Sequence, residues 1–508
     1  MTERKTVVTL HKGVDSDRFL EDMTSKHGTS HIPERAVPVY NEKKESVSNF
    51  DFILTMEEAD HLRFDPRVRG VRWGTKKECG IVIIGHAFRP VGQYPRLATP
   101  DPFHLPWAIP AMLFDSNPYV GTNLLSFEMG YTADGTGVDV VISDDGLNYN
   151  HPELLDDEGN TRVQLINWPT EANMPASIQS SSYYDVQTRG HGMHCASSVA
   201  GRTYGWAPKA EVYNMVSLES PVAFGASESL NLIKNWHLLK GTGRPTVVNA
   251  SWGYFRNWSP NKEYHVYRGV RYDTSAVRPD QGMVDPELHP DRVTSIDSDV
   301  EDLIAAGVHF VSSAGNNSYK VDIEGGADYD NSYRLLEEFT DYYWHRGSSP
   351  AAADGAINVG AIDYLDPDAQ EKIVFFTNVG PGIDLFAPGA EIQGALDNGG
   401  LYDTLVGQPY GPDTNFRCGK LNGSSFAAPQ VAGVLACYLQ LNPTATPEQA
   451  AAWIKRVAVK GRLADPTTSD ADYEVPEALL GAPNAYAVQP YRSAYPLQFA
   501  GGVSYIPI

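Results

Sequence analysis

The segment Leu421-Asn422-Gly423-Ser424-Ser425-Phe426-Ala427-Ala428-Pro429 leads from a loop of small residues into a helix. An apolar, Ala-rich run with the period of a buried helix follows from Gln430 to Leu441. Pro429 falls in the first turn, where its missing N–H is not needed. Ser425 therefore lies at a helix N-terminus, where peptide dipoles favour a developing negative charge. Taken alone, the same residues are typical of an ordinary loop and helix cap, so a nucleophilic Ser425 requires a base and an acid elsewhere.

Strands and helices alternate from Gly135 to about Val459. Most strand candidates are near-continuous apolar runs, as in strands that are buried on both faces. The expected strands are Val138–Ser143, Glu211–Ser217, Thr246–Ser251, Val308–Ser313, Ile357–Ile362 and Ile373–Asn378. The expected helices are His191–Gly201, Gly225–Leu239, Ser295–Ala306, Ser425–Leu441 and Pro447–Ala458. This alternation predicts an α/β fold with a doubly wound, mainly parallel sheet.

The first 75 residues have a different pattern. Two helices are expected, at Asp15–His27 and after a capping box that begins at Thr55. The expected strands are Thr6–Leu10, Ala36–Tyr40, Ser48–Leu54 and Val68–Trp73. The resulting order β-α-β-β-α-β predicts a small ferredoxin-like α+β domain.

We therefore divide the chain into four parts: an N-terminal domain (1–75), a linker and arm rich in Pro, Gly and aromatic residues (76–130), an α/β catalytic domain (131–460) and a C-terminal tail (461–508). Two polar, Tyr-rich stretches, about 254–293 and 317–348, interrupt the α/β pattern. We expect both to be surface insertions.

Composition excludes several classes of function. The formal net charge of -23 would repel a polyanion, so a nucleic acid partner is not expected. The sequence contains no apolar run of the roughly 18 residues that a membrane span needs, and Met1–Leu10 lacks the apolar core of a secretory signal peptide. The four cysteines, Cys79, Cys195, Cys418 and Cys437, are too few for disulfide bonds to stabilise a chain of 508 residues. We expect a protein that is made and kept in the cytoplasm of the producing cell, or one that is released by lysis.

Three further segments place reactive residues at the ends of predicted elements. Asp144 ends one expected strand, Asn316 follows another, and His191 opens a helix between two glycines. Catalytic groups in such sheets lie at the carboxyl ends of strands, where an aspartate can hold an imidazole and an Asn amide can donate to an oxyanion. Each residue alone is also typical of a turn or a structural helix end.

The combination of these residues is more specific than its parts. Acid, base and nucleophile follow in the order Asp144, His191 and Ser425, with Asn316 between base and nucleophile. This order on a parallel α/β sheet is one of the known convergent arrangements of a serine hydrolase triad.

A metal-dependent hydrolase with a ligand pair at His191 and His194 is a rival interpretation, but the acidic residue of the usual zinc-helix pattern is missing.

These segments resemble the subtilisin-like serine peptidases, or subtilases. Gly135–Asp144 resembles the Asp motif of that family, His191–Ala196 its His motif and Asn422–Pro429 its Ser motif. Ser313–Asn316 matches the segment that holds the oxyanion Asn. Asn249–Gly253 matches the segment whose backbone lines the primary specificity pocket.

The resemblance covers about residues 135 to 458 and implies peptide-bond hydrolysis through an acyl-enzyme. Ser425 would attack, His191 would shuttle the proton, Asp144 would orient the imidazole, and Asn316 with the Ser425 N–H would hold the oxyanion. The implied substrate-binding residues are Ser251, Trp252, Gly253, Ser313, Ala314 and Gly315. No cofactor and no catalytic metal is implied. Structural calcium is common in the family, but no segment identifies a site.

Departures from the family pattern are mild. Met193 and Ser424 stand where Thr is usual, and Phe426 replaces a smaller residue, but none of these changes removes a catalytic group. Asp145 resembles the kexin and furin branch, whereas Cys195 resembles the proteinase K branch. A preference for basic residues near the cut, mediated by Asp145, is therefore one hypothesis.

Residues 1–75 resemble the propeptides of the same family, above all over Phe52–Ala59 and Asp65–Arg72. Such propeptides are folding chaperones and inhibitors, which implies a zymogen whose tail after Trp73 lies in the cleft until it is cut. A permanent accessory domain is the alternative.

A weaker similarity links residues about 199–253 to subtilase-domain proteins of tailed bacteriophages, notably at Ala200–Trp206 and Leu232–Leu238. It implies a virion-associated location. We therefore predict a self-processing serine endopeptidase whose partners are a protein or peptide substrate and its own propeptide. The alternative is a virion structural or assembly protein that uses the fold as a scaffold and cuts at most itself.

Overall fold

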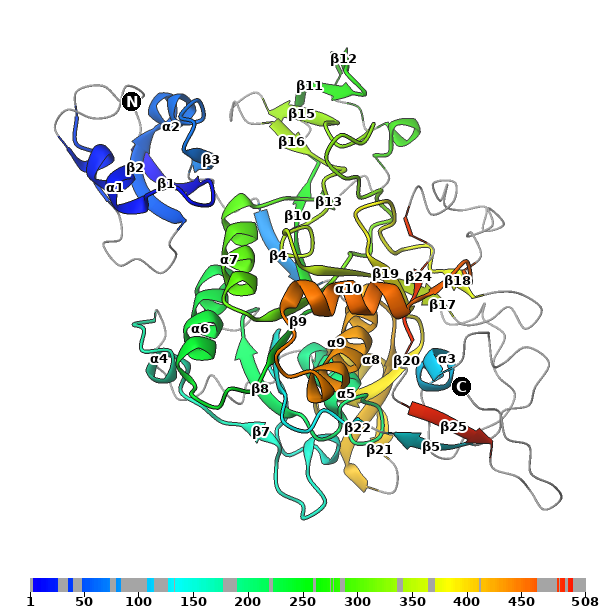
Figure 1. Cartoon of the computed structure of the whole chain (residues 1–508). Helices are drawn as coiled ribbons and strands as arrows, with labels where there is room; N and C mark the ends of the chain where they lie inside the picture. The colour runs from blue at the N-terminus through cyan, green and yellow to red at the C-terminus, as the bar shows by residue number, and fades with distance from the viewer. Residues whose placement is uncertain are drawn as a thin grey trace.

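A mainly parallel ten-stranded sheet runs through the centre of the protein, as the computed structural model shows (Figure 1). The structure describes residues 3–25, 35–39, 48–73, 79–83, 107–113, 127–131, 133–176, 190–218, 223–258, 262–274, 276, 278–283, 288–335, 341–363, 371–410, 413–463, 482–483, 485–488 and 492–496. The strand order is β23-β24-β19-β17-β14-β9-β6-β8-β7, with β18 paired to β17. The bounds are β6 Asp139–Asp144, β7 Val163–Gln164, β8 Glu211–Val216, β9 Thr246–Ala250, β14 His309–Ser313, β17 Ile357–Asp363, β18 Lys372–Ile373, β19 Leu385–Pro388, β23 Val459–Lys460 and β24 Ala485–Tyr486.

Helices cover both faces of this sheet. Along β6, Val140 and Ile142 point into one core, and Val141 points into a second core on the opposite face. The first face carries α5 (His191–Ala200), α9 (Ser424–Leu441) and α10 (Pro447–Val457). The second face carries α4 (Trp168–Glu171), α6 (Ala226–Leu239) and α7 (Thr294–Ala305). The predicted doubly wound, mainly parallel α/β fold is confirmed.

Local sequence explains where the helices of the first face begin. Thr446 and Gln449 form a capping box at α10, and Pro447 occupies the first helical position. Helix α9 is buried almost all round, because it crosses the centre of the core as an apolar helix. The expected strand Ile373–Asn378 is wrong: after β18 the chain turns at Val374–Thr377, where the Thr377 N–H bonds to the Val374 carbonyl.

The N-terminal residues form a separate antiparallel sheet in the order β2-β1-β3 (Figure 1, blue). Its elements are β1 Glu3–Leu10, α1 Ser16–Thr24, β2 Asn49–Thr55, α2 Met56–Leu62 and β3 Val68–Trp73. The Asp15 carboxylate caps α1, and Thr55 with Glu58 forms the predicted capping box of α2. Both helices pack on one face of the sheet through Phe19, Met23, Ala59 and Leu62.

One predicted strand of this region is wrong. The described part of Ala36–Tyr40 contains a single β-bridge, from Val39 to Phe52, and no strand. Pro38 explains this result, because it has no N–H for a ladder and offers only its carbonyl, which accepts from Ile53 at 3.0 Å.

The opposite face of the N-terminal sheet lies against α7. Asn49 Nδ2 donates to the Ser295 carbonyl at 2.9 Å and to Asp299 Oδ1 at 3.0 Å. Arg69 makes two hydrogen bonds to Glu301, at 2.7 and 2.9 Å. Gly70 lies so close to Thr294 that a Cβ there would approach its side chain to 3.0 Å.

The two predicted insertions meet in a four-stranded sheet of order β12-β11-β15-β16, which we call the insertion sheet. It consists of β11 Lys262–Tyr267, β12 Val270–Tyr272, β15 Ser332–Leu335 and β16 Asp341–Tyr343. An aromatic cluster of its own stabilises it, formed by Trp258, Met283, Tyr319, Tyr333, Leu335, Tyr342 and Trp344. In Figure 1 the insertion sheet stands beside the N-terminal domain, above the central sheet.

Three smaller groups of strands complete the described fold. One sheet has the order β13-β10-β4, from β13 Leu288–Pro290, β10 Trp252–Asn257 and β4 Cys79–Ile83; another has the order β20-β22-β21, from β20 Ile392–Leu396, β21 Gln408–Tyr410 and β22 Asp413–Leu421. Strand β5 (Phe127–Tyr131) pairs with β25 (Arg492–Pro496). Short helices are α3 Ala108–Leu113, α8 Leu401–Val406, η1 Pro152–Leu154 and η3 Pro279–Gln281. Most of the expected arm (76–130) and tail (461–508) lies outside the described residues.

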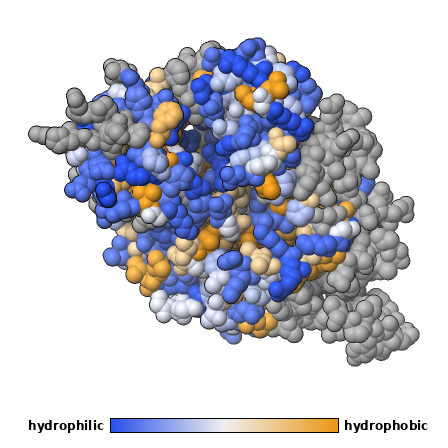
Figure 2. Space-filling view, turned by 45° about the horizontal axis from the view of Figure 1, so that its top comes forward, coloured by the Kyte–Doolittle hydropathy of each residue, from blue (hydrophilic) through white to orange (hydrophobic). Residues whose placement is uncertain are grey.

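The face of the molecule seen in Figure 2 is mainly hydrophilic, with hydrophobic residues scattered singly or in small groups. In the part of the chain that the structure describes, no helix has the length and apolar character needed to span a membrane.

Candidate active site

Asp144 is the last residue of β6, at the carboxyl end of a strand flanked by parallel neighbours on both sides. Its side chain is fully buried. Oδ1 accepts a hydrogen bond of 2.8 Å from Nδ1 of His191 and one of 2.9 Å from the Asp145 N–H. The carboxylate therefore fixes both the orientation of the imidazole and the ring nitrogen that carries the proton.

His191 is the first residue of α5, and the chain reaches it through Gly190, whose φ of 85° favours glycine. Gly192 lies against the loop after β6, because a Cβ there would come within 3.0 Å of the Asp144 side chain. Burial is the largest single influence and lowers the pKa of His191, but the charge and hydrogen bond of Asp144 together with the neighbouring Cys195 outweigh it, so the pKa lies well above its ordinary value.

Asp145 caps the same helix. Its side chain is buried, and Oδ1 accepts a 2.7 Å hydrogen bond from the Gly192 N–H. A carboxylate in the first turn of a helix satisfies a free N–H and complements the helix dipole. The hypothesis that Asp145 selects basic substrates gains no support from this position, because one oxygen is already used inside the protein.

Cys195 lies one turn after His191, with Sγ 3.9 Å from Nδ1. Burial raises the pKa of the thiol to about 11, so it is protonated at neutral pH. Within the described chain, the group of His, Cys, Asp and Glu with metal-binding geometry consists of Asp144, His191 and Cys195. A metal would have to displace the Asp144–His191 hydrogen bond and ionise the thiol.

His194, the other histidine of the rival metal interpretation, does not belong to this group. Its Nε2 is hydrogen-bonded to the Ile392 carbonyl at 2.9 Å, and its ring packs edge-on against Phe426. Burial lowers the pKa of His194 to about 3, so the imidazole is neutral. These contacts are those of a core histidine.

Ser425 is the second residue of the 18-residue helix α9, next to Phe426, whose ring centroid lies 5.3 Å from that of His191. Ser425 Oγ donates to the Ser251 carbonyl at 3.2 Å, and Ser251 Oγ donates to the Ser425 carbonyl at 2.8 Å. His191 Nε2 is buried without a hydrogen-bond partner among the described residues. The Asp–His hydrogen bond is thus formed in this state, whereas Ser425 Oγ bonds to the backbone.

Asn316 follows β14 and the left-handed Gly315. Its Oδ1 accepts hydrogen bonds from the N–H and the Oγ of Ser424, both at 2.9 Å. The amide oxygen is thereby held by the residue that precedes Ser425, which fixes the amide plane at the start of α9. Ser424 Oγ also accepts the Gly315 N–H at 3.1 Å.

The six residues expected to bind substrate are found on two buried segments. Ser251 joins β9 to β10, which begins with Trp252 and Gly253, and the Trp252 indole donates to the Ser143 carbonyl at 3.0 Å. The other segment, Ser313 to Gly315, leaves the end of β14. The structure therefore brings both segments to the carboxyl edge of the sheet, beside Ser425.

Two residues that support the site were missed by sequence reasoning. Ser424 links Asn316 to α9, as described above. Asn378 is fully buried; its Nδ2 donates to the Ala314 carbonyl at 2.8 Å and its N–H donates to the Gly315 carbonyl at 3.0 Å. Nothing local marked Asn378, because its role depends on a contact with a segment more than 60 residues earlier in the chain.

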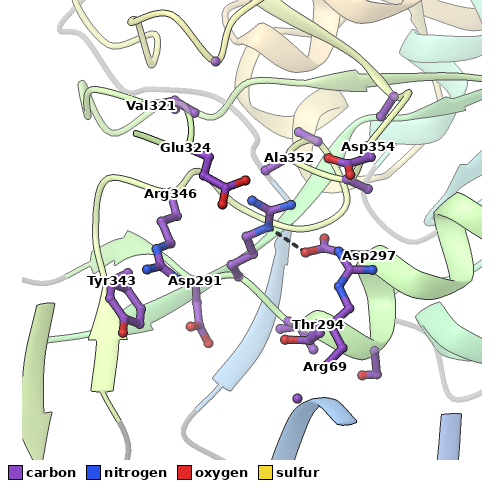
Figure 3. Close-up of a pocket in the computed structure, with 18 of the residues that line it drawn as sticks. Arg69, Asp291, Thr294, Asp297, Val321, Glu324, Tyr343, Arg346, Ala352 and Asp354 are labelled. Carbon is purple, nitrogen blue, oxygen red and sulfur yellow. Dashed lines mark hydrogen bonds and ion pairs between the residues drawn. The ribbon is translucent and has the colours of Figure 1, made fainter. Parts of the chain in front are cut away.

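A large cavity lies elsewhere, between the N-terminal domain, the insertion sheet and α10. It has a volume of about 1260 Å³, and its lining does not include Asp144, His191 or Ser425. Figure 3 shows Arg69, Asp297, Glu324, Arg346 and Asp354 around it. Arg292, which also lines the cavity, forms a 2.7 Å ion pair with Asp297. Charges of both signs line the cavity, so it favours no single ligand class.

Comparison with known proteins gives a family match. The subtilase family model matches residues 135–478. The chain is 29% identical over 345 residues to the subtilisin-like proteinase Spm1 of Pyricularia oryzae, covering 66% of this chain and 49% of that protein. It is also 29% identical over 348 residues to the subtilisin-like serine protease Cur l 4.0101 of Cochliobolus lunatus, covering 68% and 52%. The chain thus spans about half the length of these curated relatives.

A solved structure agrees with the fold. Fervidolysin from Fervidobacterium pennivorans, a keratinolytic enzyme related to subtilisin, is similar with a TM-score of 0.51 and 19% identity, covering 96% of this chain and 60% of that one. The family match extends over more than half of the sequence and includes every segment that forms the Asp144–His191–Ser425 cluster. The chain belongs to the subtilase family.

Proposed function

We propose that this protein is a serine endopeptidase that hydrolyses peptide bonds through an acyl-enzyme on Ser425. The observation that carries the proposal is the buried 2.8 Å hydrogen bond between Asp144 and His191, set beside the N-terminus of α9. A histidine held by a carboxylate and adjacent to a helix-end serine is the arrangement that activates a hydroxyl for acyl transfer.

The chemistry follows from these positions. Ser425 Oγ attacks the substrate carbonyl, and His191 Nε2 accepts its proton while Asp144 stabilises the imidazolium. The oxyanion is held by the Asn316 amide and the Ser425 N–H, where the dipole of α9 adds favourable charge. His191 then protonates the leaving amine, and a water molecule hydrolyses the acyl-enzyme. Each step uses groups of the chain, so we propose that the reaction needs no cofactor.

Substrate is proposed to lie between Ser251–Gly253 and Ser313–Gly315. Strand β10 supports this proposal, because it begins at Trp252 and its edge is paired antiparallel with β4 from Trp252↔Ile83 to Arg256↔Cys79. Strand addition to an exposed edge is a common mode of peptide binding. A segment of the protein itself thus occupies the position that an extended substrate would take.

We propose further that the chain is a zymogen. Ser425 and His191 are fully buried, so substrate requires the removal of covering chain. The N-terminal domain is held to α7 mainly by polar contacts, and β4 follows that domain in the sequence. We expect self-cleavage within a few residues after Ile83, which would release the domain and open the edge of β10.

A fluorophosphonate probe and intact mass test this proposal together. The mass of the full-length chain, 55.7 kDa, should fall by the mass of its N-terminal part, and the remaining protein should be labelled by the probe. Ser425→Ala should keep the full mass and stay unlabelled, whereas Ser295→Ala on α7 should behave like the unmodified protein.

Absence of labelling after the N-terminal domain has been removed by limited proteolysis would contradict the endopeptidase proposal. That result would support the alternative of a virion structural or assembly protein. Labelling of a chain that keeps its full mass would contradict only the zymogen proposal and would favour a permanent accessory domain.

A further inference from the structure

Strand β10 extends beyond the residues expected to bind substrate. Side chains two apart on a strand share a face, so Phe255 projects from the same face as Gly253. Gly253 has no side chain to fill the space beside the Ser313–Gly315 segment. Phe255 is therefore the first side chain beyond Ser251 on this face of the strand.

The Phe255 ring reaches across to the other segment. Its Cζ lies 3.4 Å from the position that a Cβ on Gly315 would occupy, so the ring lies beside this glycine and leaves little room for a side chain there. The side chain is 3% exposed, yet it belongs to none of the four hydrophobic cores formed by the described residues. The ring is therefore buried beside Gly315 without being part of the packing that stabilises the central sheet.

The segment next to Phe255 is held in place by hydrogen bonds from Asn378 and to Ser424. Asn378 holds Ala314 and Gly315 through both of their carbonyls, and its Nδ2 occupies the space where a Gly315 Cβ would have to be. Ser424 accepts the Gly315 N–H. Because the Ser313–Gly315 segment is fixed in this way, we do not expect it to move away from the Phe255 ring to make room for a large substrate side chain.

We propose that Phe255 determines substrate specificity by closing the end of the primary pocket, meaning the space between Ser251–Gly253 and Ser313–Gly315. The pocket then accepts a small or aliphatic side chain on the N-terminal side of the cut bond and excludes aromatic and long basic side chains. This inference rests on the proposed endopeptidase function. The sequence after Val82 is Ile83-Ile84-Gly85, which is aliphatic or small throughout and fits such a pocket.

Two peptide substrates test the proposal. They differ only in the residue on the N-terminal side of the cut bond, which is Ala in one and Phe in the other. We expect kcat/KM to favour the Ala peptide by roughly 10- to 200-fold, the range set by one or a few methylenes in a tight pocket. Phe255→Ala should remove most of this preference by improving hydrolysis of the Phe peptide. Tyr254→Ala, on the opposite face of the same strand, should keep it.

Fluorophosphonate labelling of Ser425 in the same samples separates the possible failures. A labelled enzyme that cleaves both peptides equally well, or a labelled Phe255→Ala variant that keeps the Ala preference, would overturn the pocket inference alone. An unlabelled parent enzyme would overturn the endopeptidase proposal and the pocket with it. If Phe255→Ala does not fold, Phe255→Leu should still shift the preference towards larger residues, and an unchanged ratio would count against the proposal.

Discussion

The central sheet and the N-terminal sheet are covered differently. The central sheet has helices on both faces, and each face has its own hydrophobic core. The N-terminal sheet has helices on one face only, and its other face rests on α7 through Asn49, Arg69 and Gly70. The central sheet needs no other domain to cover its faces. The N-terminal sheet depends on α7 of the neighbouring domain to cover one face, so the two domains can in principle separate at that contact. This difference agrees with the proposed zymogen, in which the N-terminal domain is removed and the central sheet remains.

The largest expected effect concerns the chemistry that only the central sheet carries. Asp144→Asn should reduce kcat by roughly 10⁴-fold, because the amide no longer stabilises the imidazolium or the correct tautomer. Only neutral His191 can act as a base, so activity should appear as the pH rises through its raised pKa. Without the Asp144 charge this pKa falls, and the pH of half-maximal activity should move downward. A pH–rate profile of both proteins measures the shift, and an unchanged midpoint would contradict the assigned pair.

A core substitution in each sheet tests the stability comparison directly. Phe52→Ala and Phe386→Ala each remove a fully buried ring and should cost about 3–5 kcal/mol. A domain of roughly 70 residues has little more stability than that, so Phe52→Ala should unfold the N-terminal domain while the central sheet persists. Hydrogen exchange of the Ser425→Ala background with each substitution measures this. Equal loss of protection in both regions of the Phe52→Ala protein would mean that they fold as one unit.

Asn316→Ala probes the oxyanion site without changing the triad. We expect a 10²–10³-fold loss of kcat with little change in KM, since one preorganised donor is removed, and a small loss of thermal stability, because Ser424 loses the acceptor of two hydrogen bonds. Steady-state kinetics with a calorimetric melting curve measure both. An unaltered rate would mean that Asn316 does not hold the oxyanion.

The smallest effect is expected at the contact between the two sheets. Arg69→Ala removes a bidentate pair with Glu301 in which both side chains are mostly buried, and it should weaken docking by about 1–2 kcal/mol. Exchange rates at α7 in the Ser425→Ala background measure the docking. Glu301→Ala should cause the same change, and the double variant should add nothing. Additive effects would show that the pair does not act as a unit.

Sequence patterns predicted the central sheet well, because its strands are apolar runs and its helices have strong end signals. The predicted His191–Gly201 and Pro447–Ala458 differ from α5 and α10 by one residue at the end. Ala36–Tyr40 failed because Pro38 cannot donate to a ladder. The insertion sheet was not predicted, since it pairs strands about 70 residues apart.

The candidate site shows the same limit. Asp144, His191, Asn316 and Ser425 were found because each belongs to a short motif. The contacts that hold these residues were not predicted. Ser424 bonds to Asn316, which lies 108 residues earlier in the sequence, and Phe255 lies beside Gly315 on the other substrate-binding segment. Such partners have no local signature, and only the folded chain brings them together.

The pairing of β5 with β25 has a consequence for the chain as a whole. It joins Phe127–Tyr131 to Arg492–Pro496 and so connects a strand near the start of the α/β region with one near the end of the sequence. A force that separates β5 from β25 therefore acts on both ends of the α/β region at once. A circular permutant that opens the chain elsewhere should therefore keep the fold only if both strands are retained.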